Sequence, residues 1–201
     1  MELFPAFYLF VLSMAITPGP NNTMLLASGL NHGVRRSLPH WVGVNLGFGL
    51  MVIILGFGLG SIFQAAPALH QVIRFGGVLY LCYLAWLIAS TPTKENDPRS
   101  AKPLSLWQAG LFQWVNPKAW VMITGAIATY TTPGLNIYVQ VLLLTVIFLV
   151  VGSPCGVVWL VGGAGLKRVM KNPRHHRMFN VSMALLLVSS LYPVVKGLLV
   201  P

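Results

Sequence analysis

The chain carries very little charge, and acidic side chains are its scarcest group. Charged residues occupy 8% of its 201 positions, whereas a soluble domain carries charge at about 25% of them. Glu2, Glu95 and Asp97 are the only carboxylate side chains. So little polar surface cannot cover a globule in water. The hydrophobic share of 56% therefore predicts that lipid hydrocarbon surrounds much of the chain.

The scarcity of acids and cysteines also argues against several kinds of chemistry. The apolar runs hold no paired carboxylates and no His-Glu-x-x-His motif, so we expect no enzyme, no catalytic residue and no cofactor. The two cysteines, Cys82 and Cys155, lie in separate runs, and no ligand cluster typical of a metal site is present. A transmembrane thiol-redox relay and a metal-ion exporter are kept as alternative interpretations.

Six apolar stretches are long enough to form helices that cross about 30 Å of hydrocarbon. They are continuously apolar rather than alternating, which favours helices over a barrel. We therefore predict an all-α membrane protein with a single transporter domain over residues 1–201. The predicted spans are Phe4–Leu30, Leu38–Phe63, Leu69–Ser90, Trp107–Tyr130, Ile137–Leu166 and Met178–Val195.

The basic residues predict how these spans are oriented. The net charge of +10 comes from short tracts between apolar runs, not from a soluble basic face, so nucleic acid is not an expected partner. The positive-inside rule places the loops after the first, third and fifth spans in the cytoplasm, and both termini on the opposite side. The basic residues of these loops are Arg35, Arg36, Lys94, Arg99, Lys102, Lys167, Arg168, Lys171, Arg174 and Arg177.

A helix break is predicted within the first span, at residues 17–22 (TPGPNN). Two prolines remove backbone donors and clash with carbonyls four residues back, and the glycine between them adds no rigidity. Backbone N–H and C=O groups without a helical hydrogen bond are tolerated inside a bilayer only where they are buried in protein or line a water-filled cavity. A simple proline kink is the alternative. The residues expected to line a cargo site here are Pro18, Gly19, Pro20, Asn21 and Asn22.

A second break is predicted within the fourth span, at residues 113–118 (QWVNPK). It would bring Lys118 about 16 Å into the bilayer at 1.5 Å per residue, near the midplane. A lysine there costs about 2.5–3.5 kcal/mol, and no span offers an acid to pair with it. We interpret Lys118 as the counter-ion for the carboxylate of an amino-acid cargo, with Asn116 and Pro117 beside it. Snorkelling of Lys118 to the headgroups is the alternative.

Small residues predict where helices pack closely. Gly43-x-x-x-Gly47 and Gly56-x-x-x-Gly60 have the spacing that lets helix backbones approach. Packing within the chain is the first interpretation, and the interface of a possible homodimer is the second. A third group, residues 152–156 (GSPCG), is expected to break the fifth span as a hinge or packing notch.

The two predicted breaks together resemble the signature of a known transporter family. The motif at residues 18–22, followed by Gly29, Gly33 and Arg35, and the motif at residues 116–119 (NPKA) resemble the LysE/RhtB family of amino-acid exporters. Loop residues 91–95 (TPTKE) and 101–103 (AKP) are similar to its cysteine/O-acetylserine exporter subgroup. The resemblance covers the whole chain. It implies export of small neutral amino acids, from cytoplasm to periplasm across a bacterial inner membrane, driven by the proton gradient.

Each half of the chain contains three predicted spans, so the second half is inserted upside down relative to the first. This favours two inverted three-helix repeats, with the broken helices in corresponding spans. Proton coupling lacks its usual carrier, because no predicted span contains a carboxylate. His40 and Lys118 are the candidate proton-linked groups. Histidine titrates near neutral pH, and burial lowers the pKa of a lysine, which would let Lys118 exchange a proton. An interfacial His40, bonded to a headgroup or loop, is the alternative interpretation.

Overall fold

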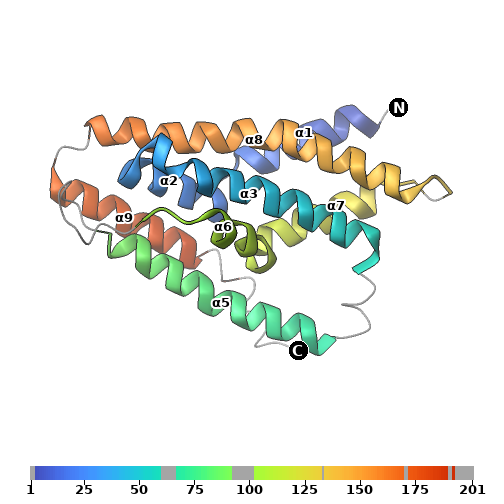
Figure 1. Cartoon of the computed structure of the whole chain (residues 1–201), viewed down its shortest axis with the longest axis horizontal. Coiled ribbons are helices and arrows are strands. Elements are labelled where there is room, and N and C mark those ends of the chain that lie inside the picture. Colours follow the sequence, from blue (N-terminus) through green and yellow to red (C-terminus); the bar gives the residue numbers. More distant parts are fainter. Residues whose placement is uncertain are drawn as a thin grey trace.

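The computed structural model describes residues 3–59, 67–91, 102–132, 134–169, 172–189 and 192. Every regular element among them is helical, which confirms the predicted all-α class (Figure 1). The elements are α1 (Leu3–Ile16), α2 (Pro20–His32), α3 (Val34–Ile54), η1 (Leu55–Leu59), α5 (Pro67–Ala89), α6 (Leu106–Phe112), η2 (Gln113–Val115), α7 (Pro117–Tyr130), α8 (Ile137–Val169) and α9 (Pro173–Ser189).

The first and fourth predicted spans are interrupted helices. α1 ends at Ile16 and α2 begins at Pro20, with Gly19 fully extended between them (φ −176°, ψ 177°). α6 passes into the short turn η2, and α7 then begins at Pro117. Pro20 and Pro117 each start a new helix, a position where the missing backbone donor costs nothing.

The predicted break in the fifth span is wrong. α8 runs without interruption from Ile137 to Val169 and contains Pro154. A single proline is tolerated in a membrane helix when neighbouring helices satisfy the freed backbone groups. The residues around it instead form a notch for α3: the indole of Trp41 donates to the carbonyl of Ser153 (3.1 Å) and lies against Gly156.

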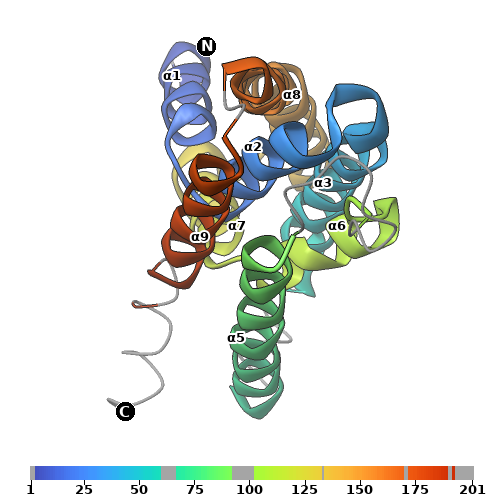
Figure 2. The ribbon, with the colours of Figure 1, turned by 90° about the vertical axis from the view of Figure 1, so that its left-hand side faces the viewer.

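α2 and α8 pack backbone against backbone at two glycines. A Cβ added to Gly29 of α2 would meet the carbonyl of Leu160, and one added to Gly163 of α8 would meet the carbonyl of Leu26. Helices approach this closely only where small residues line both surfaces. Figure 2 shows α2 in the middle of the bundle, beside α8, α3 and α9.

Among the described residues, the glycines that were predicted to pack against other helices do so within the chain. A Cβ on Gly43 would meet the carbonyl of Leu106, and one on Gly47 would meet the backbone of Gly110, so α3 rests directly on α6. Gly56 faces the side chain of Val141 on α8. Gly60 lies outside the described residues.

Two separate hydrophobic cores lie on either side of the helix breaks. One is built by α1, α3, α7 and α8 around side chains such as Phe7, Ile123 and Phe148. The other is built by α2, α5, α6 and α9 around Phe112 and Leu187. Each interrupted span thus contributes one half to each core, which brings the two interruptions together between the cores.

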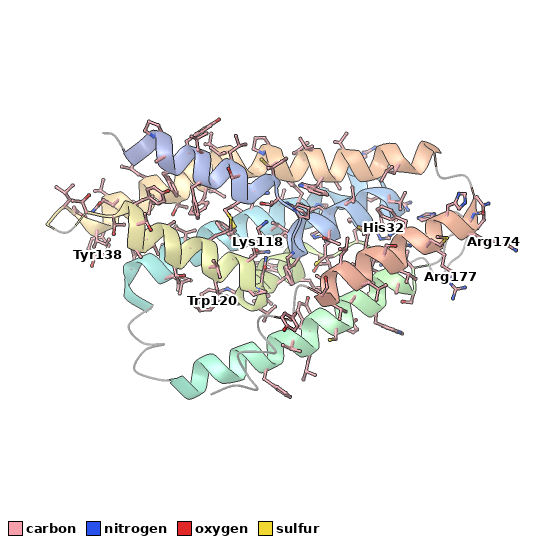
Figure 3. The ribbon with its side chains drawn as sticks, turned by 180° about the vertical axis from the view of Figure 1, so that it is seen from behind. His32, Lys118, Trp120, Tyr138, Arg174 and Arg177 are labelled. Atoms are coloured by element: carbon pink, nitrogen blue, oxygen red, sulfur yellow. The ribbon has the colours of Figure 1, made fainter. Side chains whose placement is uncertain are left out.

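The outer surface is apolar, as a surrounding bilayer requires. Large hydrophobic side chains stand exposed on several helices, among them Leu46, Trp86, Val150 and Leu185. By length and composition, residues 34–58 and 137–166 are each able to cross a membrane unbroken. Figure 3 shows His32, Arg174 and Arg177 at one end of the bundle and Tyr138 at the other.

Candidate functional site

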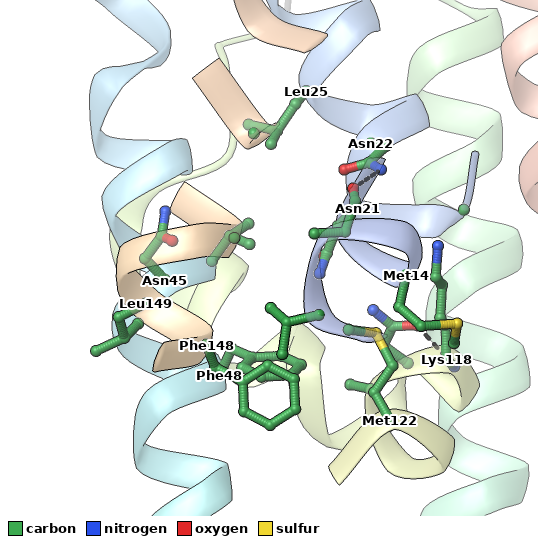
Figure 4. A pocket seen from close by; sticks show the side chains of 18 residues that line it. Met14, Asn21, Asn22, Leu25, Asn45, Phe48, Lys118, Met122, Phe148 and Leu149 are labelled. Atoms are coloured by element: carbon green, nitrogen blue, oxygen red, sulfur yellow. Dashed lines mark hydrogen bonds between the residues drawn. The ribbon is translucent and has the colours of Figure 1, made fainter. Parts of the chain in front are cut away.

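A cavity of about 80 Å³ lies where the two helix breaks face each other (Figure 4). It has room for roughly six water-sized groups, which suits a small amino acid. One part of its wall is polar and the other part is apolar. The polar side chains are Asn21, Asn22, Asn45, Asn116 and Lys118. The apolar ones include Val11, Met14, Phe48, Met122, Phe148 and Leu149.

The carboxyl end of α1 is capped by side chains from both breaks. Asn22 donates its amide to the carbonyls of Ala15 (2.7 Å) and Thr17 (2.8 Å). The ammonium of Lys118 donates to the same Thr17 carbonyl (2.8 Å). These bonds satisfy carbonyls that the end of α1 would otherwise leave bare inside the bilayer. A cation is also favoured at a helix carboxyl end by the helix dipole.

Lys118 is half-buried and lines the cavity, with its stem against Gly19. A Cβ on Gly19 would lie 2.8 Å from Cδ of Lys118 and 3.2 Å from its Nζ. The backbone of the first break and the side chain of the second are therefore in direct contact. In this position the ammonium is held within the break by its bond to the carbonyl of Thr17.

Two helix amino ends border the cavity and favour a negative charge there. Asn116 caps α7 by accepting a hydrogen bond from the backbone of Lys118 (3.1 Å), and its side chain is only 2% exposed. Gly19 precedes α2 without any side-chain cap. Backbone donors at helix amino ends attract anions. Among the described cavity residues no carboxylate competes for them.

Gln113 is a site residue that was not among the predicted cargo-site residues. Its amide pairs reciprocally with that of Asn21: Asn21 donates to it at 2.9 Å, and it donates back at 3.1 Å. It also donates to the carbonyl of Ala109 (3.0 Å) and is fully buried. Gln113 thereby holds Asn21 at the cavity and joins the two breaks. Its position next to the Asn-Pro-Lys motif was the only sequence signal for this role.

This amide pair predicts a measurable coupling between two residues far apart in the sequence. Gln113→Leu leaves the Asn21 amide without its partner, which should lower stability by about 1–3 kcal/mol. The double variant Asn21→Leu, Gln113→Leu removes both polar groups and should recover part of that loss. Thermal unfolding of the purified single and double variants in detergent measures this cycle. Strictly additive losses would contradict the pairing.

The remaining wall of the cavity comes from α3 and α8. Asn45 donates to the carbonyl of Trp41 (2.7 Å) and accepts from the hydroxyl of Ser153, which links the two helices at the cavity. The rings of Phe48 and Phe148 meet edge to face, 5.1 Å between centroids. Apart from Asn45, apolar runs give no sequence signal for which of their side chains line a cavity.

Other predicted candidates lie away from this cavity. His40 is 1% exposed, so its ring is enclosed by protein, and neither ring nitrogen has a hydrogen bond within the described residues. Cys155 is buried in α8 and Cys82 is exposed on α5, both as free thiols, and neither lines the cavity. No group of metal-ligating side chains occurs in the described segments.

Comparison with known proteins gives a consistent result. The sequence profile of the LysE type translocators matches residues 12–190. The chain is 35% identical over 187 residues to proteins named cysteine/O-acetylserine efflux protein from Escherichia coli (strain K12), Shigella sonnei (strain Ss046) and Shigella flexneri. These alignments cover 92% of this chain and 94% of each relative. No solved structure matches.

Proposed function

Because the chain belongs to the family of LysE type translocators, we propose that it exports small neutral amino acids of the cysteine and O-acetylserine kind from cytoplasm to periplasm. Members of this family are multi-pass inner-membrane transporters and not enzymes. The observation that supports the cargo is the central cavity, whose polar wall combines a lysine, amides and two helix amino ends with no acid among the described residues.

The cavity fits each part of such a cargo. A carboxylate is attracted by Lys118 and by the backbone donors at the start of α2 and α7. An ammonium group is accepted by amide oxygens, of which that of Asn22 makes no hydrogen bond within the described residues. A small uncharged side chain packs on the apolar wall near Met14 and Met122. A cationic side chain finds no acid to pair with, which favours neutral cargo.

The transport cycle we propose is alternating access between two inverted three-helix repeats, within one transmembrane domain of six spans. The interrupted spans supply the cargo site, with Pro18, Gly19, Pro20, Asn21 and Asn22 from the first. Asn116, Pro117 and Lys118 come from the second. Support comes from the matching halves, since each interrupted span contributes to both cores. Such half-helix ends at the bilayer midplane are the usual binding elements of secondary transporters.

Orientation, coupling and assembly complete the proposal. The basic loops face the cytoplasm and both termini face the periplasm, by the positive-inside rule. A proton is the coupling ion, carried by Lys118 or His40, the candidates that the acid-free spans leave. A homodimer would have to form without Gly43 and Gly47, because α6 already covers both.

Efflux from loaded cells tests the cargo. Cells expressing the chain are loaded with labelled cysteine, O-acetylserine, lysine or glutamate, beside cells expressing an equal amount of Lys118→Met. We expect faster loss of cysteine and O-acetylserine only, and only with the unaltered chain. Export of lysine in preference to the neutral cargoes would contradict the proposal, since the cavity offers its second ammonium no acid.

A further inference from the structure

A second cavity, of about 60 Å³, lies on another face of α2, nearer to the end with the basic loops. It shares no lining residue with the central cavity. Its walls come from α2, α3, the last turns of α5 and the segment before α6. Figure 3 shows one of its residues, His32, at the same end of the bundle as Arg174 and Arg177. This end faces the cytoplasm in the proposed orientation.

The charged and titratable side chains of this second cavity are all basic: His32, His40 and Lys102. No carboxylate occurs among the lining residues that the structure describes. The other polar side chains on the wall are already bonded within the protein. Ser28 donates to the hydroxyl of Ser37 (2.8 Å), Asn31 donates to the amide oxygen of Asn180 (3.0 Å) and Thr91 donates to the carbonyl of Leu87 (2.8 Å).

Two of the basic groups have no partner in the described part of the chain. Both ring nitrogens of His40 are buried without a hydrogen bond. Lys102 is exposed, and its ammonium forms neither a hydrogen bond nor an ion pair with the described residues. Of the two groups only the ring of His40 is buried, and buried polar groups without partners are uncommon in folded proteins and call for a ligand or water. A carboxylate carries two acceptor oxygens on one carbon, so it can accept hydrogen bonds from two donors on the wall of one cavity.

The rest of the wall indicates what the acceptor is attached to. Met24, Leu84, Leu87, Ile88 and Leu104 supply an apolar surface next to the basic groups. A carboxylate on a short carbon chain matches both surfaces, whereas free phosphate offers nothing to the apolar one. The volume admits roughly four or five water-sized groups, which limits the ligand to a small molecule.

We propose that the second cavity binds the carboxylate of small organic acids through Lys102 and His40, and serves as the cytoplasmic loading site of the exported amino acid. The loading role rests on the proposed export function, whereas carboxylate binding does not. α2 carries both cavities, with Asn21, Asn22 and Leu25 at the central one and Met24, Ser28 and Asn31 at the second. A cargo held at the second cavity is therefore about one and a half helical turns further along α2 than the first.

Binding is tested on purified, full-length protein in detergent, with Lys118→Met as the background so that the central cavity is impaired. Acetate replaces chloride at constant ionic strength, and the midpoint of thermal unfolding is followed, because a ligand of the folded state raises it. Adding Lys102→Gln should raise the acetate concentration needed several-fold, since an ion pair with an exposed lysine contributes about 0.2–1 kcal/mol. Adding Arg177→Gln, which removes another exposed charge at the same end but outside the cavity, should change nothing.

Three outcomes would overturn the site: no response to acetate, equal responses of the Lys102→Gln and Arg177→Gln proteins, or a response to inorganic phosphate alone. His40→Gln is the second variant, with a similar loss of acetate response expected. The loading role is tested by Lys102→Gln alone in cells. We expect a several-fold higher cytoplasmic cargo concentration for half-maximal efflux at an unchanged maximal rate. If Lys102→Gln leaves the cargo dependence unchanged while acetate binding by the unaltered site is intact, the loading role is overturned and carboxylate binding is not. Absence of any efflux by the unaltered chain would refute the export function instead.

Discussion

Lys118→Met is expected to reduce export of cysteine or O-acetylserine at least about tenfold while the protein still folds. The ammonium is the only cation on the described wall of the central cavity, and a hydrogen bond to a charged group contributes about 1.5–3 kcal/mol. Methionine has a similar length and fits the space beside Gly19. The carbonyl of Thr17 keeps its bond from Asn22, so the end of α1 stays capped.

The measurement separates a cargo contact from a purely structural role. Initial efflux rates are recorded over a range of internal cargo concentrations, and the amount of folded protein is measured by gel filtration in detergent. A counter-ion predicts weaker apparent affinity at normal protein levels. Lys118→Arg keeps the charge and should retain more activity than Lys118→Met. Full export by Lys118→Met would show that the cargo carboxylate does not need this lysine.

Gly163→Ala is expected to cause a large loss of stability although it adds only a single methyl group. Its Cβ would meet the carbonyl of Leu26, where α2 and α8 touch backbone to backbone. Backbone cannot rotate away as a side chain can, so the two helices must separate. Overpacking of this kind costs about 3 kcal/mol. The unfolding midpoint should fall by roughly 6–12 °C for a chain of this size.

Gly165→Ala is the matched control for that change. It lies two residues further along α8, and a Cβ there meets nothing within 4 Å. Alanine should be neutral or stabilise the helix by up to about 1 kcal/mol. Both variants are compared by thermal unfolding in the same detergent. Equal midpoints for Gly163→Ala and Gly165→Ala would mean that α2 and α8 do not cross as closely as described.

Local chemistry was enough to predict the elements of this site. The helix breaks at Pro18–Pro20 and at Pro117 follow from the missing backbone donors of proline, which act within one turn of the residue. Helical class and membrane embedding follow from long apolar runs with few charges. The fifth helix shows the limit of such reasoning. Pro154 has the same local effect, but α3 packs on the notch around it and α8 stays continuous.

Which side chains meet was decided by tertiary structure alone. Asn21 and Gln113 are 92 positions apart in the sequence, and nothing local indicates that their amides pair. The burial of His40 and the second cavity likewise depend on how α2, α3 and α5 pack together. By itself, the sequence determined where the helices run, where two of them break and which groups carry charge. Tertiary structure determined which of these groups face one another, because contacts between distant residues depend on the packing of whole helices, and no residue carries that information alone.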